Sequence, residues 1–462
     1  MCGVLTRDGV HESACAPGAG QGVRRAARSR ARRGRRGGGV GFSFIHAADM
    51  HLDTPFEGIA RVSPEIASQL RDASLDAFDG LVDCAIRNDA AFVLLAGDNY
   101  DGSVRGVRAQ LRMLRGLERL SARGIKTFII NGNHDPPEGW SAVKSWPEGV
   151  TVFGHETVAS AAVERGGVHL ATVHGISFSQ RTAGENLAAR FTRASAPGFH
   201  VGLLHCSAGA NTEHESCCPT TVRDLQEAGM NYWALGHVHK REFLCEGGPW
   251  IVYPGNLQGR SPKPSECGAK GAVVVEVDGS QVVRVEFAPL DRVRFAVSFV
   301  DVSTLADLPA LRRMLVQRLE QLRKEHEGRG LLVRAVLRGR GGVHRDLIRL
   351  GAVEALCEDL RGECKGMEPF VWWESIQDAT RSRIDVEQVR LRGDFLSELV
   401  KVAERIGAGE ESRAAFFRDV CANLPAARLQ GRIPELDGGA EAEELERAVM
   451  LALELLEEES DS

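Results

Sequence analysis

The chain has 462 residues, of which 43% are hydrophobic and 26% are charged. This composition excludes a collagen-like, fibrous or largely disordered protein, and the length predicts two or three domains. The net charge of −6 argues against a protein that coats nucleic acid over its whole surface. The 11 cysteines form no CxxC pair, so we expect reduced thiols in a cytoplasmic protein. No run of 18 apolar residues is present, so we expect no membrane-spanning segment.

The first 40 residues differ in character from the rest of the chain. They contain nine arginines against Asp8 and Glu12, with Gly and Ala between them. No apolar segment follows the arginines, which argues against a signal peptide. Over residues 1–40 the composition favours a disordered basic extension, or an upstream stretch read from the wrong start codon. A basic arm that contacts phosphates is the alternative.

From residue 41 onward, apolar runs and helical patterns indicate an α/β domain. Runs at residues 42–48, 91–96 and 126–130 predict strands, and residues 63–88 and 104–123 predict the helices between them. Further apolar runs, with few helices between them, lie at residues 168–173, 200–204, 232–235, 250–253 and 271–277. We therefore expect a catalytic domain over residues 41–290 that pairs two sheets and flanks them with helices.

The pattern changes near residue 290 and predicts a second, smaller domain over residues 291–462. Predicted strands at residues 295–302 and 331–337 flank a helix whose leucines recur at helical spacing, at positions 308, 311, 315, 319 and 322. Two more helices are expected near residues 394–406 and 441–458. The last 28 residues are strongly acidic with one apolar face. They predict a solvated amphipathic helix, with a helix that docks a partner as the alternative.

Five short polar motifs each follow an apolar strand, at the end of a sheet where sites of α/β proteins are built. Their residues are oxygen and imidazole donors, a set that suits Mn²⁺, Fe²⁺ or Zn²⁺. Seven such donors are too many for one ion, but they suit two ions that share a carboxylate and activate a hydroxide for attack on phosphorus. The seven candidate ligands are Asp49, His51, Asp98, Asn133, His205, His237 and His239, and the motifs also contain Asp101, His134 and Asp135.

The order of these motifs, D-x-H, G-D-x-x-D, G-N-H-D, H and G-H-x-H, resembles that of the calcineurin-like metallophosphoesterases. The resemblance implies a β-sandwich flanked by helices, followed by a smaller α+β capping domain. It also implies a role for each residue. The first ion would be held by Asp49, His51 and His239, the second by Asn133, His205 and His237, and Asp98 would bridge the two.

The same resemblance assigns catalytic roles to the third motif. His134 would face the substrate, and Asp135 would orient it. Purple acid phosphatases of this superfamily have a Tyr three residues after the bridging Asp, whereas this chain has Asp101 there. We therefore expect two Mn²⁺ ions rather than an Fe(III) centre.

Segments at residues 44–53, 128–140 and 253–260 resemble SbcD-type and YhaO-type DNA repair exonucleases. That resemblance implies a Mn²⁺-dependent phosphodiesterase that acts on DNA, with an SMC-like ATPase of the SbcC type as partner and a homodimer as a further candidate assembly. Arg260 follows a glycine-containing turn in the last segment, and we expect it to contact a substrate phosphate. Two alternatives stay open: a phosphodiesterase or phosphatase of small nucleotides, and a DNA-docking or ATPase-docking scaffold without catalysis.

Overall fold

The computed structural model describes residues 41–54, 56, 64–102, 106–136, 142–180, 184–193, 195, 197–209, 217–326, 328–423 and 438–460. The predicted basic extension over residues 1–40 lies outside the described residues.

The first sheet of the structure carries the earliest strands of the chain. Its central strands β1, β2 and β3 run parallel to one another and β4 continues the parallel run, whereas β11 and β12 pair antiparallel at the other edge. The strands, in spatial order, are β12 (Gln281–Pro289), β11 (Gly271–Asp278), β1 (Phe42–Ala47), β2 (Phe92–Ala96), β3 (Lys126–Ile130) and β4 (Val150–Val152).

The second sheet also has a parallel centre and antiparallel edges. Strands β6, β7, β8 and β10 run parallel, and β5 and β9 close the two edges. In spatial order they are β5 (Ala159–Arg165), β6 (Val168–Gly175), β7 (Phe199–His205), β8 (Tyr232–Gly236), β10 (Trp250–Tyr253) and β9 (Glu242–Cys245). Nearly every residue of β7 and β8 is buried, as expected for parallel strands that are covered on both faces.

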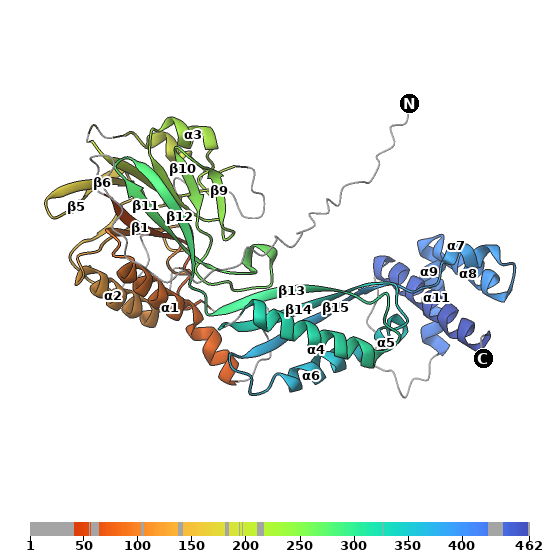
Figure 1. The fold of residues 1–462 in the computed structure, drawn as a ribbon. Helices are drawn as coiled ribbons and strands as arrows, with labels where there is room; N and C mark the ends of the chain where they lie inside the picture. Colours follow the sequence, from red (N-terminus) through yellow and green to blue (C-terminus); the bar gives the residue numbers. More distant parts are fainter. Residues whose placement is uncertain are drawn as a thin grey trace, which may run out of the picture. The chain divides into compact units, whose positions relative to one another are not determined.

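Aromatic side chains fill the space between the two sheets. Phe44 stacks on Phe92 with ring centroids 4.8 Å apart, and Tyr232 of the second sheet meets Phe44 edge-on at 5.1 Å. The helices α1 (Pro64–Arg87) and α2 (Val107–Ser121) pack on the outer face of the first sheet (Figure 1). The short helices η2 (Leu187–Arg190) and α3 (Val222–Glu227) pack on the outer face of the second sheet. This arrangement confirms the predicted pair of sheets flanked by helices.

A separate three-stranded sheet follows in the chain. Strand β14 (Gly330–Gly339) lies between β13 (Val293–Asp301) and β15 (Val371–Thr380), and all three run parallel. The helices α4 (Leu308–Glu325), α5 (His344–Leu347) and α6 (Ala352–Glu363) share an apolar core with one face of this sheet. Trp373 is fully buried in that core, where its ring packs rather than meets solvent.

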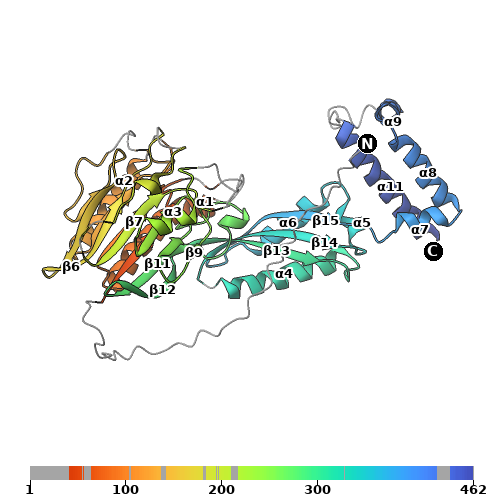
Figure 2. The same ribbon diagram turned by 90° about the horizontal axis from the view of Figure 1, so that it is seen from above.

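The last part of the chain is helical. Helices α8 (Phe395–Gly407), α9 (Glu410–Asn423) and α11 (Gly438–Ser460) lie alongside one another in Figure 2, and α7 (Val386–Leu391) contacts α8. A small apolar cluster around Val400 and Leu453 joins α7, α8 and α11. The helix expected near residues 441–458 is α11. Among the described helices, none is both long enough and apolar enough to cross a membrane.

Candidate metal centre

The loops after β1 and β2 are tied together by their backbones. Asp49 donates its N–H to the carbonyl of Gly97 at 3.1 Å, and His51 donates to the carbonyl of Asp98 at 3.0 Å. Asp49, His51 and Asp98 have φ values of 50°, 41° and 49°, in the left-handed region that side-chain-bearing residues rarely adopt. Such strained backbone collects at functional sites, where the surrounding structure holds it in place.

Two motif glycines let neighbouring loops approach closely. A Cβ atom at Gly132 would collide with the carboxylate of Asp98, and one at Gly236 would collide with the carbonyl of Ala96. Both contacts join different strands, and the second joins the two sheets. The glycines in G-N-H and G-H-x-H therefore bring the polar loops to one place, which no larger residue allows.

The first group of candidate ligands comes from both sheets. Asp49, His51 and His239 each place one ligand atom within 4.8 Å of the other two. Nε2 of His51 lies 3.2 Å from Nε2 of His239, so two ring nitrogens face each other. Asp49 and His51 are almost fully buried. The structure thus brings together the three residues that the motif resemblance assigned to the first ion.

The second group surrounds the side-chain oxygen of Asn133. This oxygen lies 3.0 Å from Nε2 of His205 and 3.2 Å from Nδ1 of His237. One carboxylate oxygen of Asp98 lies 3.3 Å from Nε2 of His205 and 3.9 Å from Nε2 of His51. Asp98 therefore stands between the two groups, at the position that a bridging ligand requires.

The electrostatics of this cluster suit a divalent cation. Burial alone would lower the pKa of His205, but the charges of Asp98 and Asp49 outweigh burial and raise it to about 10. Two buried carboxylates thus draw positive charge to this point, and an ion would supply that charge in place of the proton. Burial holds the pKa of His51 well below its usual range, so its ring is neutral, the form that binds metals. Nδ1 of His51 is buried without a hydrogen-bond partner. The residues therefore fit divalent metal ions.

A carboxylate that no motif contains supports His239. Oε1 of Glu266, in η3 (Pro264–Glu266), lies 2.5 Å from Nδ1 of His239. Its other oxygen accepts hydrogen bonds from Nδ2 of Asn256 at 2.7 Å and from the backbone of Arg260 at 3.0 Å. Lys270 donates to the carbonyl of His239 at 2.7 Å. A carboxylate on the second ring nitrogen fixes the tautomer and the orientation of a metal-binding histidine.

His134 lies beside the ligands, and its side chain is 46% exposed. Its Nδ1 is 2.7 Å from a carboxylate oxygen of Asp101, and its backbone N–H donates to Asp98 at 2.9 Å. The other oxygen of Asp101 accepts from Arg260 at 3.1 Å. The hydrogen bond that the ring of His134 donates to Asp101 is the main reason that the pKa of His134 is raised.

The carboxylate that contacts the ring of His134 is therefore that of Asp101, whereas the motif resemblance assigned this role to Asp135. The oxygens of Asp135 accept instead from the backbone of Gly132 at 2.6 Å and from the backbone and side chain of Asn99 at 3.0 and 2.8 Å. Asp135 is completely buried, so it holds the loops after β2 and β3 together. The roles differ because the G-N-H-D turn directs this side chain back beneath the loop.

Sequence comparison agrees with the geometry. Residues 42–241 match the profile of calcineurin-like phosphoesterases, and residues 295–381 match the middle domain of the metallophosphoesterase YhaO. Over 345 residues the chain is 35% identical to the metallophosphoesterase YhaO of Bacillus subtilis, covering 74% of this chain and 83% of that protein. The chain belongs to the YhaO family of calcineurin-like metallophosphoesterases. This membership makes it a metal-dependent phosphoesterase.

More distant relatives match over a shorter stretch. The chain is 27% identical over 213 residues to the DNA double-strand break repair protein Mre11 of Sulfurisphaera tokodaii, covering 44% of this chain and 54% of that protein. It is 28% identical over 223 residues to the Mre11 protein of Thermoplasma acidophilum, covering 45% and 57%. The chain therefore spans about half the length of these Mre11 relatives.

Two supporting residues of the site were missed at the level of sequence. Asp101 belongs to the G-D-x-x-D motif, but its contact with His134 was not predicted, and Glu266 belongs to none of the five motifs. The carboxylate at the last position of the G-D-x-x-D motif is the signal that could have indicated this contact. For Glu266 the chain offers no local signal, because the contact with His239 bridges 27 positions and depends on how β10 and η3 return to the site.

Proposed function

We propose that this phosphoesterase is a Mn²⁺-dependent DNA exonuclease of the cytoplasm that acts in DNA repair. The observation that carries the proposal is the placement of Asp98 between two buried ligand groups, with the exposed His134 held beside them. This arrangement suits in-line attack on a phosphodiester. The likeness to proteins named for DNA double-strand break repair supports DNA as the substrate.

In the proposed mechanism Asp49, His51 and His239 would hold the first ion, Asn133, His205 and His237 would hold the second, and Asp98 would serve both. Two divalent ions bound there would polarise the phosphate and lower the pKa of the attacking water. Two side chains of the protein then act on the substrate directly.

His134 is the proposed catalytic acid. Its Nδ1 is engaged by Asp101, so Nε2 is the atom left to face the substrate. The raised pKa of His134 favours the protonated ring, which can stabilise charge on the phosphoryl oxygens or protonate the leaving oxygen. Arg260 is the proposed phosphate contact: its Nη1 bonds to Asp101, while its Nε is buried without a partner.

The proposal extends to assembly. We infer that the protein works with an SMC-like ATPase of the SbcC type and that it forms a homodimer. The residues beyond 290 would then serve as a capping domain over the DNA. These inferences follow the family resemblance, and the first experiment below does not depend on them.

The test compares two DNA forms of one sequence. The full chain is incubated with Mn²⁺ and either end-labelled linear double-stranded DNA or a covalently closed circle. We expect cleavage of the linear form only, because an exonuclease needs an end. Asp98→Asn should abolish it, since the shared carboxylate loses its charge, and this variant also controls for contaminating nucleases.

Three outcomes separate the alternatives. Cleavage of both forms would replace the exonuclease by an endonuclease. Hydrolysis of a small phosphodiester with both DNAs intact would favour a nucleotide phosphodiesterase. If no substrate is cut and Asp98→Asn behaves as the unaltered protein, the scaffold alternative stands.

A further inference from the structure

A cysteine lies beside the second group of candidate ligands. Cys217 is 3% exposed. Its backbone N–H donates to Oγ of Ser207 at 2.9 Å, and its carbonyl accepts from the N–H of Ser207 at 2.6 Å. Ser207 follows His205 by two residues, just past the end of β7. These two hydrogen bonds fix Cys217 next to His205 through the backbone, so its position does not depend on its side chain.

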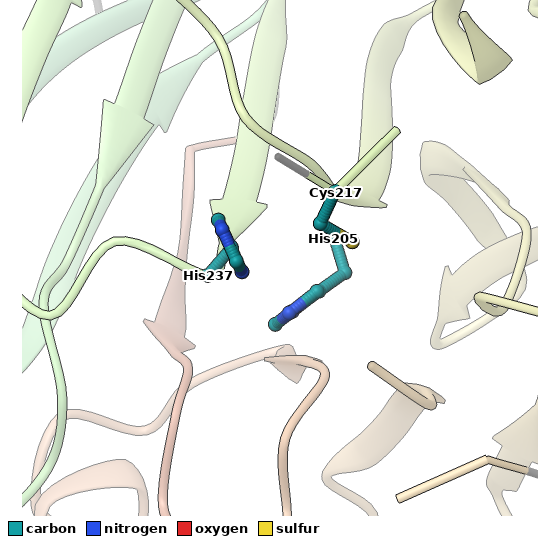
Figure 3. A group of neighbouring side chains, drawn as sticks. All are labelled: His205, Cys217 and His237. Carbon is teal, nitrogen blue, oxygen red and sulfur yellow. The ribbon is translucent and has the colours of Figure 1, made fainter. Parts of the chain in front are cut away.

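The thiol of Cys217 converges with two imidazoles. Sγ of Cys217 and one ring nitrogen each of His205 and His237 all lie within 4.8 Å of one another (Figure 3). Ligand atoms around one tetrahedral zinc ion are roughly 3.5 Å apart. Shifts of about 1 Å, within the reach of a side-chain rotation, would therefore bring all three atoms onto one ion. Asn133 already lies 3.0 and 3.2 Å from the same two rings.

Two other cysteines in the same apolar cluster provide a comparison. Cys206 and Cys218 are both completely buried in it. Among the described residues, however, Cys217 is the cysteine that stands in a metal-binding group with two histidines. Burial is therefore common to all three cysteines, whereas convergence with His205 and His237 distinguishes Cys217.

We infer that Cys217 is a further ligand of the ion held by His205 and His237, and that it makes this position favour Zn²⁺ over Mn²⁺. On binding, the thiol releases its proton to solvent and the thiolate donates an electron pair to the ion. Thiolates select Zn²⁺, whereas a position with only oxygen and nitrogen donors accepts Mn²⁺ readily. The inference rests on the proposed function for the existence of a second ion, and it adds which ion that position prefers.

Cobalt provides a test that does not use catalysis. The metal-free full chain is titrated with Co²⁺ while near-ultraviolet absorbance is recorded, because a thiolate bound to Co²⁺ gives a charge-transfer band there. We expect this band in the unaltered protein, its loss in Cys217→Ser, and its retention in Cys206→Ser and Cys218→Ser. Absence of the band from the unaltered protein, or its persistence in folded Cys217→Ser, would overturn the inference.

Metal competition is the second measurement. In Cys217→Ser, the Zn²⁺ affinity should fall by about 10-fold or more, while the Mn²⁺ affinity changes by less than about 2-fold. Equal effects on both ions would count against the inference. Circular dichroism checks folding. If Cys217→Ser does not fold, retention of the band in both Cys206→Ser and Cys218→Ser still supports Cys217, and its loss in either one contradicts it.

The two proposals fail separately. If the cobalt band is present but linear DNA stays intact, Cys217 is a ligand and the nuclease proposal fails. If linear DNA is cut but the band is absent, the nuclease proposal stands and the thiolate ligand is excluded.

Discussion

The two sheets contribute to the metal centre in different ways. In the first sheet, loops after neighbouring parallel strands brace one another through the backbone, as in the bonds from Asp49 to Gly97 and from His51 to Asp98. In the second sheet, His239 is held by side chains from a later part of the chain, above all by Glu266 and Lys270. One half of the site is therefore built by strand order and the other by a network of side chains.

This difference predicts how each half responds to mutation. A backbone brace survives the loss of one side chain, so changes of supporting residues in the first half that are not ligands themselves should alter chemistry more than metal binding. A network built from single side chains loses its geometry with any member, so changes in the second half should alter metal affinity first. The predictions below test this division.

The largest effect is expected at Asp101, in the first half. Asp101→Asn removes the charge that orients His134 and favours its protonation. We expect kcat to fall by about 100-fold to 1000-fold, the usual contribution of a positioned acid, while the metal content stays unchanged. Steady-state kinetics and metal analysis of the purified protein measure the two quantities.

Asp72→Asn is the matched control, because Asp72 pairs with Arg108 on α2 and Arg108 is half-exposed. It should leave kcat unaltered. If Asp101→Asn instead lost its metal ions and kept its turnover when Mn²⁺ was restored, Asp101 would support the ligands and not His134, and the proposed division would fail in the first half.

Glu266→Gln tests the second half. The amide keeps the size of the side chain but weakens the hold on Nδ1 of His239, so we expect metal affinity to fall by about 10-fold to 100-fold. At saturating Mn²⁺ the turnover should approach that of the unaltered protein. Titration of activity with Mn²⁺ separates these quantities. The control is Glu363→Gln, because Glu363 on α6 pairs with Arg312 on α4, away from the ligands. A low turnover that saturating metal does not restore would contradict the assignment.

Metal binding should also stabilise the fold, because the proposed ligands of each ion come from both sheets. At about 100 times its Kd, Mn²⁺ should raise the free energy of unfolding by about 2.7 kcal/mol. Chelation should remove this gain. Thermal unfolding with and without Mn²⁺ measures it, and Asp98→Asn should show a smaller shift. An equal shift in both proteins would place the stabilising ions elsewhere.

Much of this site could be predicted from the sequence, because the donors follow apolar strands and parallel strands end at a common edge. The pattern located Asp49, Asp98, Asn133 and His205 without knowledge of any contact. It also predicted the long helices α1 and α4, whose apolar spacing extends over several turns. Elements and motifs that a local residue pattern defines can therefore be predicted from the sequence.

The remaining features depend on contacts between distant segments. The support of His239 by Glu266, the place of Cys217 beside two histidines and the contact of Asp135 with Asn99 each join loops that are separate in the chain. Short elements such as α3 and β9 carry too few residues to show a period. Asp135 is the clearest case, because its position beside His134 in the chain suggested a contact that the turn geometry gives to Asp101.

The smallest effect is expected from a buried pair in the second sheet, away from the ligands. Nε2 of His174 lies 3.0 Å from Nδ1 of His200, and Nδ1 of His174 lies 2.8 Å from Oγ of Ser160. Burial, aided by His200 and Arg193, lowers the pKa of His174 to about 4. In the unfolded chain His174 therefore binds a proton near pH 6.5, whereas in the folded protein it binds one only near pH 4. Stability from this group is complete above pH 6.5 and is lost as the pH falls toward 4.

At pH 5 the loss should amount to about 1 to 2 kcal/mol. Urea unfolding at pH 7 and pH 5 measures this loss for the unaltered protein and for His174→Gln. The comparison between the two proteins is needed because other buried histidines with a lowered pKa, such as His46, also reduce the stability of the protein as the pH falls. The variant should be less stable at pH 7 but should show a shallower fall in stability between the two pH values. An identical fall in stability in His174→Gln would mean that the His174–His200 pair rearranges to accept the proton. The second sheet would then be more deformable at this point than its burial indicates.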